Sequence, residues 1–565
     1  MKLVECVPNF SEGRDRMKIA AITNAIEAVD GVTILDVDSG SDTNRTVVTF
    51  IGSPETVVEA AFQVIKLASE LIDMSQQTGT HPRMGATDVC PFIPISDVTD
   101  EECVELSKQV GKRVGDELGV PVYLYEKSAQ RKDRIKLPDI RKGEYEGLSE
   151  KLKNEDWMPD FGPAKLHVKA GATVMGCREF LIAYNINLNT KDQRLATDIA
   201  FELREAGRSK RTPNPNSKNL LDGEIVRNIV GKPVKVSGMF KDVKGIGWYV
   251  DMFKRSQISI NFNNYKVSTI HDVFDAACKL AAERGLRVTG SELVGLIPLE
   301  ALLMAGKHYL KKQNRSLGVP MADIVECAVQ SLGLNDVTKF NPRKKIIDYA
   351  VQSDDRPLMS LSSTDFLEEL STNSPAPGGG SVSALAGSLG AALASMVAAL
   401  THEKKELMVL KPEMDEVGIE AQLLKDRLNL LVDEDTVAFN KVMEANRLLA
   451  ATDGERETKA VAVGKANKYA IEIPLEAAEC CFRVIELSEI LVEKGNPISV
   501  TDAGVAAEVG LAGVRGAAMN VLVNLSGVDD NSYCDEKRNV VNALILKAEA
   551  KHKVVFENTL EKIEN

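Results

Sequence analysis

The chain has 565 residues, of which 44% are hydrophobic and 27% are charged, and its formal net charge at pH 7 is -13. This length exceeds what one hydrophobic core supports, so we expect several folded units, and the composition is that of a soluble globular protein and not of a disordered one. The acidic balance argues against general nucleic-acid binding, which needs a basic face, but it is compatible with a local basic patch for a small anion.

Nine cysteines are spread along the chain without any CxxC spacing. This pattern predicts reduced thiols in a cytoplasmic protein, with neither a disulfide framework nor a zinc site. At the N-terminus, Glu5 and Pro8 interrupt any apolar signal core. Residues 381–400 form an uncharged run that is long enough to span a bilayer. Because this run consists mostly of Ala, Gly and Ser, we expect a buried helix of a soluble bundle and no membrane segment.

The N-terminal part of the chain alternates strand and helix patterns in the order β-α-β-β-α-β, which is typical of a ferredoxin-like arrangement. Its expected elements are strand 3–8, helix 14–29, strands 32–38 and 45–51, helix 54–74 and strand 89–95, followed by helix 100–118 and strand 120–125. The same order returns in strand 181–188, helix 191–205, strands 247–252 and 257–261, helix 270–284 and strand 286–289. We therefore predict an α+β N-terminal half of two ferredoxin-like subdomains, residues 1–180 and 181–350, with a ligand cleft between them.

Three further segments complete the expected organisation. Residues 209–243 are rich in Pro, Asn, Lys and Gly and are too long for an ordinary connection, which indicates a lid, a loop or an insertion. Residues 351–363 contain Ser353-Asp354-Asp355-Arg356-Pro357 and are typical of a linker. From residue 364 to 565, strand patterns and aromatic residues become rare and Ala-rich helical patterns dominate, which predicts an all-α helical-bundle domain.

A histidine stands on the predicted connection between helix 54–74 and strand 89–95, in the stretch His81-Pro82-Arg83-Met84-Gly85-Ala86-Thr87-Asp88. Pro82 disfavours helical geometry at His81, and connections of this kind often carry catalytic groups. An imidazole with an ordinary pKa near ~6.5 can take up a proton and return it at neutral pH. The competing interpretation is a histidine that is exposed or caps a turn.

Motifs along the whole chain, taken together and in order, resemble the formimidoyltransferase-cyclodeaminase family. In the first half they are Cys6-Val7-Pro8-Asn9-Phe10-Ser11-Glu12-Gly13, Asp36-Val37-Asp38, Asn44-Arg45-Thr46, His81-Pro82-Arg83-Met84-Gly85, Gly171-Ala172-Thr173-Val174, residues 180–188, Gly245-Ile246-Gly247-Trp248-Tyr249 and residues 290–299. In the second half they are Ala376-Pro377-Gly378-Gly379-Gly380-Ser381, Leu431-Val432-Asp433-Glu434-Asp435, Thr501-Asp502 and Asn520-Val521-Leu522-Val523-Asn524-Leu525. The main departure is the 209–243 region, which is longer than we expect of the animal proteins and bears on access to the first site.

The resemblance implies a bifunctional, cytoplasmic folate enzyme of histidine breakdown and one-carbon metabolism. Its first half would move the formimino group from N-formimino-glutamate to N5 of tetrahydrofolate, and its second half would cyclise the product to 5,10-methenyl-tetrahydrofolate with release of ammonia. Tetrahydrofolate, in a polyglutamylated form, is then a co-substrate, and we expect no metal. Two alternatives stay open: a single-activity transferase with a silent helical half, and a folate-binding protein without turnover.

At the first site the resemblance makes His81 the residue that takes the proton from folate N5 and gives one to the departing glutamate nitrogen. Arg45 and Arg83 are candidates for the carboxylates of glutamate, because guanidinium binds carboxylate bidentately, and ion pairing within the protein is an equally open interpretation. Asp38 would orient His81 or bind a cation, unless it only caps a turn. Asn44 joins these candidates through the motif it shares with Arg45.

The resemblance places folate on a ten-residue segment, which consists of Gly162, Pro163, Ala164, Lys165, Leu166, His167, Val168, Lys169, Ala170 and Gly171. Glycine and proline suit a backbone that lies against a flat pterin, and the two lysines suit the glutamate tail. Without the resemblance this segment is only a loop between elements. We interpret His167 as incidental and not as a second base.

At the second site Asp435 matches the family's catalytic aspartate and would handle the protons of cyclisation. Asp433 lies two positions away, so on a helix the two carboxylates diverge and do not form a pair. The turn Gly378-Gly379-Gly380-Ser381 opens a helix whose free N–H groups can hold a carboxylate or a pterin carbonyl. A tight start to a closely packed helix explains the same glycines equally well, and nucleotide binding is rejected because Gly-Lys-Ser/Thr is absent.

Three polar residues complete the second set of candidates: Asp502, Asn520 and Asn524. The two asparagines are four residues apart and share a helix face, so their amides would meet a pterin edge or bond between helices. Ala-rich helices, together with the resemblance, predict a homo-oligomer. A basic path formed by residues such as 208–211 and 241–244 would favour passage of the folate intermediate between the two sites.

Overall fold

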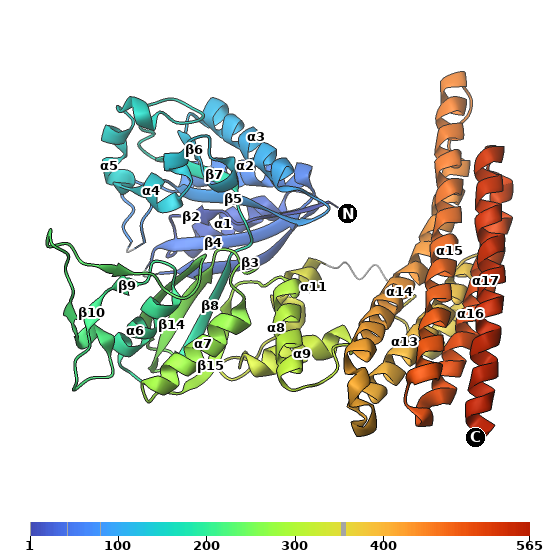
Figure 1. The fold of residues 1–565 in the computed structure, drawn as a ribbon. Helices are drawn as coiled ribbons and strands as arrows, with labels where there is room; N and C mark the ends of the chain where they lie inside the picture. Colours follow the sequence, from blue (N-terminus) through green and yellow to red (C-terminus); the bar gives the residue numbers. More distant parts are fainter. Residues whose placement is uncertain (1, 42, 80, 352–357, 565) are drawn as a thin grey trace. The chain divides into compact units, whose positions relative to one another are not determined.

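A computed structural model describes residues 2–41, 43–79, 81–351 and 358–564 (Figure 1). Contacts divide the chain into two compact units, each of which is described by itself. The first unit comprises Met1–Met304 with Leu332–Val351, and the second comprises Ala305–Ser331 with Gln352–Asn565. Residues 352–357 of the linker predicted at 351–363 lie outside the described residues.

The first unit begins with a sheet in which β3 pairs with β4, and the short strands β1 and β2 both lie between β4 and β5. The order then continues with β7 and β6. Its strands are β1 Leu3–Cys6, β2 Asn9–Phe10, β3 Val32–Gly40, β4 Arg45–Gly52, β5 Thr87–Ser96, β6 Val122–Leu124 and β7 Thr173–Cys177. The pairings are antiparallel except for β5 with β7 and β6 with β7. The helices are α1 Arg16–Glu27, α2 Pro54–Leu71, α3 Asp100–Leu118, α4 Leu137–Arg141 and α5 Glu144–Lys151. Strand and helix types are thus confirmed in every predicted position of this part.

Local sequence explains where the helices of this sheet begin. Ser53 accepts the N–H of Thr56 at the start of α2, and Thr99 forms a capping box with Glu102 at the start of α3. Such caps satisfy N–H groups that the first turn of a helix leaves free. The buried face of α2, with Val57, Val64 and Ile65, then packs into the core of the sheet. This packing fixes the loop that follows α2, which carries His81.

A second sheet follows in the same unit, in the order β13-β14-β8-β15 and with all pairings antiparallel. Its elements are β8 Ile182–Leu188, α6 Gln193–Leu203, β13 Val243–Val250, β14 Arg255–Phe262, α7 Ile270–Glu283 and β15 Val288–Val294. These match the predicted order of strands and helices, although β13 begins four residues earlier and β15 ends five residues later than predicted. The strand order repeats that of β3-β4-β1-β5, so the two sheets share one plan.

The 209–243 region contains ordered secondary structure and is more than a plain loop. It holds the short strands β9 Arg208–Ser209, β10 Arg211–Thr212, β11 Glu224–Ile225 and β12 Lys235–Val236. β9 pairs with β12 and β10 pairs with β11, and Figure 1 shows these hairpins extending away from the second sheet. The unit also contains α10 Pro342–Lys345 and α11 Ile347–Val351.

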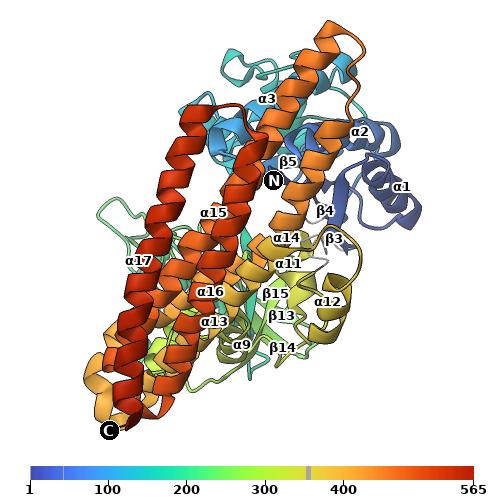
Figure 2. The same cartoon turned by 90° about the vertical axis from the view of Figure 1, so that its right-hand side faces the viewer.

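The second unit is a bundle of long helices, as predicted (Figure 2). They are α12 Ser363–Leu370, α13 Gly379–Glu403, α14 Lys411–Arg447, α15 Asp453–Lys494, α16 Val500–Asn524 and α17 Asn531–Glu564, joined by α9 Met321–Ser331 and the C-terminal part of α8 Leu299–Lys312. Glycine permits the close packing of these helices: a Cβ on Gly387 would lie 2.3 Å from Cys481 Sγ, and one on Gly318 would lie 2.5 Å from Gly418 Cα.

Two segments of the bundle, α13 and Pro497–Gly527, are long and apolar enough to cross a membrane by length and composition alone. Of their apolar windows, 56% and 50% are buried inside the unit. Core helices of soluble bundles pass the same test, so the segments are weak evidence for a membrane span. The predicted buried helix at 381–400 corresponds to α13, whose buried side is lined by Ala391, Ala394 and Ala398. All nine cysteines are free thiols.

Candidate functional sites

His81 is held by its backbone neighbour and by an arginine. Its Nδ1 lies 2.7 Å from the Pro82 carbonyl oxygen, and since a carbonyl only accepts, Nδ1 carries the proton in the neutral ring. Nε2 therefore has the lone pair, and Nη1 of Arg45, at the start of β4, is in contact with it. The ring is thus fixed with its basic nitrogen turned toward a guanidinium.

This environment weakens the histidine as a base. Burial, followed by the positive charges of Arg45 and Arg141, lowers the pKa of His81 to about 4. Burial and the charge of Arg141 likewise lower the pKa of Arg45 to about 10. The ordinary imidazole pKa expected from the sequence therefore does not hold for the free protein, because Arg45 and Arg141, whose charges act on His81, are remote from it in the chain. At neutral pH His81 is uncharged, and its lone pair faces Arg45.

Arg141 and Asp88 belong to this site, although Arg141 was missed in the sequence and Asp88 was only part of a motif. A side-chain ion pair joins Arg141 Nη2 to Asp88 Oδ2, with the two side chains 13% and 3% exposed. The other Asp88 oxygen accepts the N–H of Met84 at 2.7 Å and so closes the loop after His81. Arg141 ends the short helix α4, where no periodicity or motif distinguishes it from other surface arginines.

Arg83 and Asn44 have structural partners. The Arg83 guanidinium donates to Glu146 at 2.7 Å and to Glu144 at 3.0 Å, with its Nε on Gln77. This is the ion-pair alternative, so Arg83 is committed within the protein. Asn44, with φ 47°, accepts the N–H of Gly13 at 2.9 Å and donates to the Thr78 carbonyl at 2.8 Å. Its amide thereby ties two loops together beside Arg45.

Asp38 is exposed on β3 opposite Val47. The strand continues to Gly40, two residues beyond the predicted end, so Asp38 lies within the strand. Its negative charge acts on Arg45 and favours the charged form of that guanidinium. The described residues give no hydrogen bond between Asp38 and His81.

The ten-residue folate segment, 162–171, reaches the His81 loop at its C-terminal end. Gly171 pairs with Gly85, and the Ala170 carbonyl accepts the N–H of Ala86 at 2.8 Å. Gly171 has φ +71°, and a Cβ there would lie 2.2 Å from the Met84 carbonyl oxygen, so only glycine allows this approach. His167 Nδ1 accepts the N–H of Ala170 at 2.9 Å, which is a turn-forming role, as expected of an incidental histidine.

The other members of this segment divide between packing and exposure. Gly162 packs against Val120 and Gly115, so its glycine serves the protein core. Nζ of Lys169 contacts the Glu70 carbonyl oxygen. Pro163, Ala164, Lys165 and Val168 are exposed.

In the helical unit, Asp435 of α14 lies on the first turn of α13. Its Oδ2 accepts the N–H of Ser381 at 2.9 Å and lies 3.1 Å from the Ser381 hydroxyl, whose one proton is shared with the Val432 carbonyl oxygen at 2.9 Å. Burial raises the pKa of Asp435, and the two bonds from Ser381 act against that rise. The helix N-terminus predicted to receive a ligand carboxylate is therefore partly occupied by a carboxylate of the protein itself.

Glycines make this contact possible. A Cβ on Gly380 would lie 2.1 Å from Asp435 Oδ1, so any larger residue would displace the carboxylate. A Cβ on Gly379 would lie 3.4 Å from Nδ2 of Asn520, which places this amide from α16 beside the same turn. Asn520 Nδ2 itself donates to the Gly516 carbonyl at 2.9 Å. Gly378, the N-cap residue, completes the turn.

The remaining candidates of the helical unit lie elsewhere. Asn524 donates to the Ala470 carbonyl of α15 at 2.7 Å, which is the interhelical bond named as its alternative role. Asp502 stands eighteen residues before Asn520 on α16, about 27 Å away at the usual helical rise. Within one chain it is therefore far from Asp435. Asp433 accepts the N–H of Leu358 at 2.9 Å, so it diverges from Asp435 as predicted.

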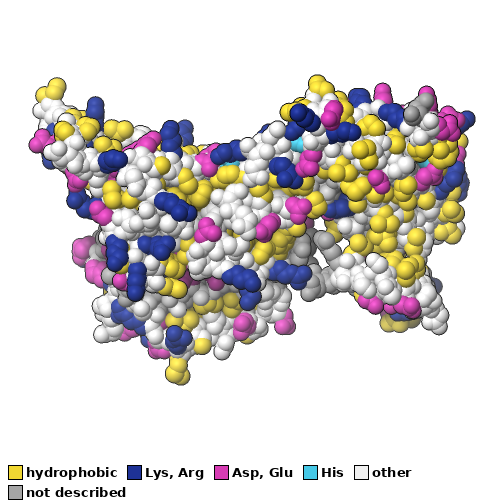
Figure 3. Space-filling view, turned by 90° about the horizontal axis from the view of Figure 1, so that it is seen from below, with side chains coloured by type: hydrophobic (Ala, Val, Ile, Leu, Met, Phe, Trp, Pro, Cys, Tyr) yellow, Lys and Arg dark blue, Asp and Glu magenta, His cyan; other side chains and the backbone are white. Residues whose placement is uncertain are grey.

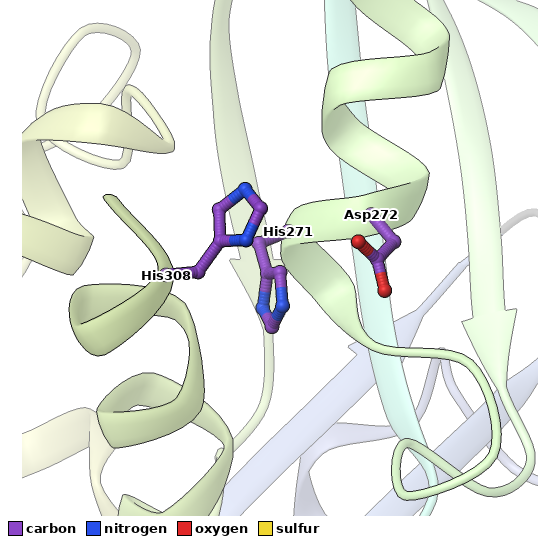
Figure 4. A group of neighbouring side chains, drawn as sticks. All are labelled: His271, Asp272 and His308. Carbon is purple, nitrogen blue, oxygen red and sulfur yellow. The ribbon is translucent and has the colours of Figure 1, made fainter. Parts of the chain in front are cut away.

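Figure 4 draws His271 and Asp272, at the start of α7, with His308 of α8. His308 belongs to the second unit and the other two belong to the first. The Thr269 hydroxyl lies 3.1 Å from His271 Nε2 and donates to Asp272 at 2.6 Å. We therefore assign no metal ligands to these residues.

Comparison with known proteins identifies the family of the chain. Family models described as "Formiminotransferase domain, N-terminal subdomain", "Formiminotransferase domain" and "Formiminotransferase-cyclodeaminase" match residues 3–178, 183–352 and 362–543. A Dictyostelium discoideum protein named Formimidoyltransferase-cyclodeaminase is 42% identical over 98% of both chains. Glutamate formimidoyltransferase of Streptococcus pyogenes is 41% identical over 55% of this chain and 95% of its own length. Methenyltetrahydrofolate cyclohydrolase of Methylorubrum extorquens is 37% identical over 35% of this chain and 95% of its own length. The chain belongs to the formimidoyltransferase-cyclodeaminase family.

Proposed function

We propose that the chain catalyses two consecutive folate reactions of histidine breakdown. The first transfers the formimino group of N-formimino-L-glutamate to N5 of tetrahydrofolate, and the second cyclises 5-formimino-tetrahydrofolate to 5,10-methenyl-tetrahydrofolate with release of ammonia. The observation that carries the proposal is that each unit holds one candidate acid/base group. The first has a neutral His81 with its Nε2 lone pair beside a guanidinium, and the second has a half-buried Asp435.

In the transfer, folate N5 attacks the formimino carbon and forms a tetrahedral intermediate. His81 Nε2 takes the proton from N5 and then gives it to the glutamate nitrogen as the bond between that nitrogen and the carbon breaks. The folate segment ends against the His81 loop through the Gly85–Gly171 contact, which supports a pterin held next to this base.

In the cyclisation, N10 attacks the formimino carbon and ammonia departs. Asp435 takes the N10 proton and delivers it to the departing nitrogen, while its negative charge stabilises the amidinium and methenyl cations. Ser381 holds Oδ2, so Oδ1 is the oxygen available for proton transfer. Asn520 beside Gly379 supplies an amide for the pterin edge.

Several finer assignments belong to the same proposal. The strand orders β3-β4-β1-β5 and β13-β14-β8-β15 support two ferredoxin-like subdomains, residues 1–180 and 181–350, followed by a linker and a helical domain from residue 364. The enzyme is cytoplasmic and needs no metal. Exposed Lys165 on the folate segment suits a polyglutamate tail. Arg208 and Arg211 do not contribute to a basic path, since Arg208 pairs with Asp198 and Arg211 donates to two carbonyls.

The enzyme is also a homo-oligomer in this proposal. Val382, Leu389, Met396 and Leu400 form a stripe along α13, each 40–55% exposed, at spacings that place them on one helix face. Figure 3 shows apolar side chains gathered over the helical unit. A stripe of this kind is typical of a helix that packs against a second copy.

A coupled assay tests the proposed function. Purified protein is mixed with tetrahydrofolate and N-formimino-L-glutamate, and methenyl-folate absorbance and ammonia are followed together. We expect both signals in the wild type, loss of transfer in His81→Ala, and transfer without ammonia in Asp435→Asn. Folded protein that is silent at both steps but binds tetrahydrofolate would favour a binding protein. Transfer without ammonia in the wild type would favour a silent helical half.

A further inference from the structure

The His81 site contains two guanidiniums with unused hydrogen-bonding capacity. The Nε groups of Arg45 and Arg141 are buried and have no partner among the described residues. Buried donors of a native protein normally have partners, so two unsatisfied Nε–H donors at one site indicate that a ligand supplies the acceptor. Arg83, the guanidinium nearer to His81 in the sequence, already has Glu144 and Glu146.

The positions of the two guanidiniums are set by the protein. Asp88 holds Arg141 through Oδ2 and is itself fixed by the Met84 N–H. Arg45 begins β4 and rests against Nε2 of His81. Arg45 thus contacts the imidazole, and the charge of Arg141 acts on the same ring from a different element, as expected of a preorganised anion site.

We propose that Arg45 and Arg141 form a carboxylate-binding subsite beside His81, and that a carboxylate of the amino-acid substrate occupies it. This inference rests on the proposed transferase function and assigns the substrate carboxylate to Arg141 in place of Arg83. It also gives Arg45 a second role. When the carboxylate accepts the Arg45 N–H groups, Arg45 no longer donates to Nε2, and the lone pair becomes available to folate N5.

The subsite is tested with Arg141→Lys, which keeps the charge next to Asp88 but loses the planar fork. We expect KM for N-formimino-L-glutamate to rise about tenfold or more, as for the loss of one charge-assisted hydrogen bond, with KM for tetrahydrofolate within twofold of the wild type. Calorimetric binding of L-glutamate, the reaction product, is expected to weaken by a similar factor. Arg131→Lys is the matched control, because Arg131 also pairs with aspartates, Asp133 and Asp156, but at the surface.

The outcomes separate the subsite from the transferase function. Wild-type protein without transfer would remove the proposed function itself. Active Arg141→Lys with unchanged KM and unchanged glutamate binding would overturn the subsite alone. A rise in KM caused by Arg83→Lys and not by Arg141→Lys would move the carboxylate to Arg83. Thermal unfolding of each variant, compared with the wild type, shows whether a loss of activity or binding comes from misfolding. If Arg141→Lys misfolds, the same KM values are compared for Arg141→Gln.

Discussion

Burial shifts the pKa of the candidate acid/base group in opposite directions at the two sites. Around His81, burial disfavours the cation, and two arginines add to that effect, so the pKa falls to about 4. Around Asp435, burial disfavours the anion and raises the pKa, but two hydrogen bonds from Ser381 oppose the rise. In the first site the positive charges of the arginines add to the pKa shift that burial causes. In the second site the hydrogen bonds at a helix N-terminus reduce that shift. In the α/β unit, charged residues from elements far apart in the sequence act on the loop that carries His81. In the helical unit, the environment of Asp435 comes mainly from the first turn of α13.

The largest effect should come from Gly380→Ala. The added Cβ would lie 2.1 Å from Asp435 Oδ1 and 2.5 Å from Cγ, so the carboxylate must move. A displacement of about 1 Å at a reacting group can cost about 10²-fold in rate, and we expect ammonia release to fall by at least this factor. Assays that start from 5-formimino-tetrahydrofolate and measure the ammonia formed at fixed times give this rate.

Gly454→Ala is the control for that substitution, because a Cβ at Gly454 on α15 meets nothing within 4 Å. It should leave ammonia release unchanged within twofold. If Gly380→Ala were as active as Gly454→Ala, Asp435 would not act from the position seen in the structure.

The next effect concerns the pH dependence of transfer. Because the pKa of His81 is about 4 in the free protein, Nε2 stays unprotonated as the pH falls from 8 to 5. The kcat/KM of transfer should therefore lose no activity to His81 protonation near pH 6.5, where an ordinary histidine would be half protonated. An NMR titration of the ring, assigned with His81→Gln, gives an independent measurement. A ring that titrates near 6.5 would show that Arg45 and Arg141 do not act on it.

Sequence reasoning could find the elements and the reacting groups but not the environment of those groups. Strand and helix types followed from periodicity and caps, and His81 and Asp435 followed from motifs. The roles of Arg83 and Arg141 could not be ranked, because Glu144 and Asp88, their respective partners, are more than fifty residues from them. Likewise, the helical spacing of Asn520 and Asn524 showed a shared face, but not that one meets α13 and the other α15.

A smaller effect is expected from Ser381→Ala, which removes the hydroxyl bond to Asp435 but keeps the backbone N–H bond. Less stabilisation of the anion should raise the pKa of Asp435 further. Because Asp435 works as the anion when it takes the N10 proton, activity is lost as the pH falls through that pKa. The acid limb of ammonia release should therefore move to higher pH, by about one pH unit for a bond of roughly 1.5 kcal/mol. Ser381→Thr, which retains a hydroxyl, is expected to move it less.

The smallest effect belongs to Asn524→Ala, which distinguishes a bond that holds helices together from one that faces the reaction. The Asn524 amide donates to the Ala470 carbonyl across α15 and α16 at 2.7 Å, and its loss should lower the free energy of unfolding of the helical unit by about 1 kcal/mol. Urea unfolding monitored by circular dichroism measures the shift. Asn520 lies beside Gly379 at the Asp435 turn, so Asn520→Ala should instead weaken folate binding in the cyclisation step. If Asn524→Ala weakened folate binding more than Asn520→Ala, the face of α16 that receives the pterin would lie toward α15, and the assignment of Asn520 to the pterin edge would be wrong.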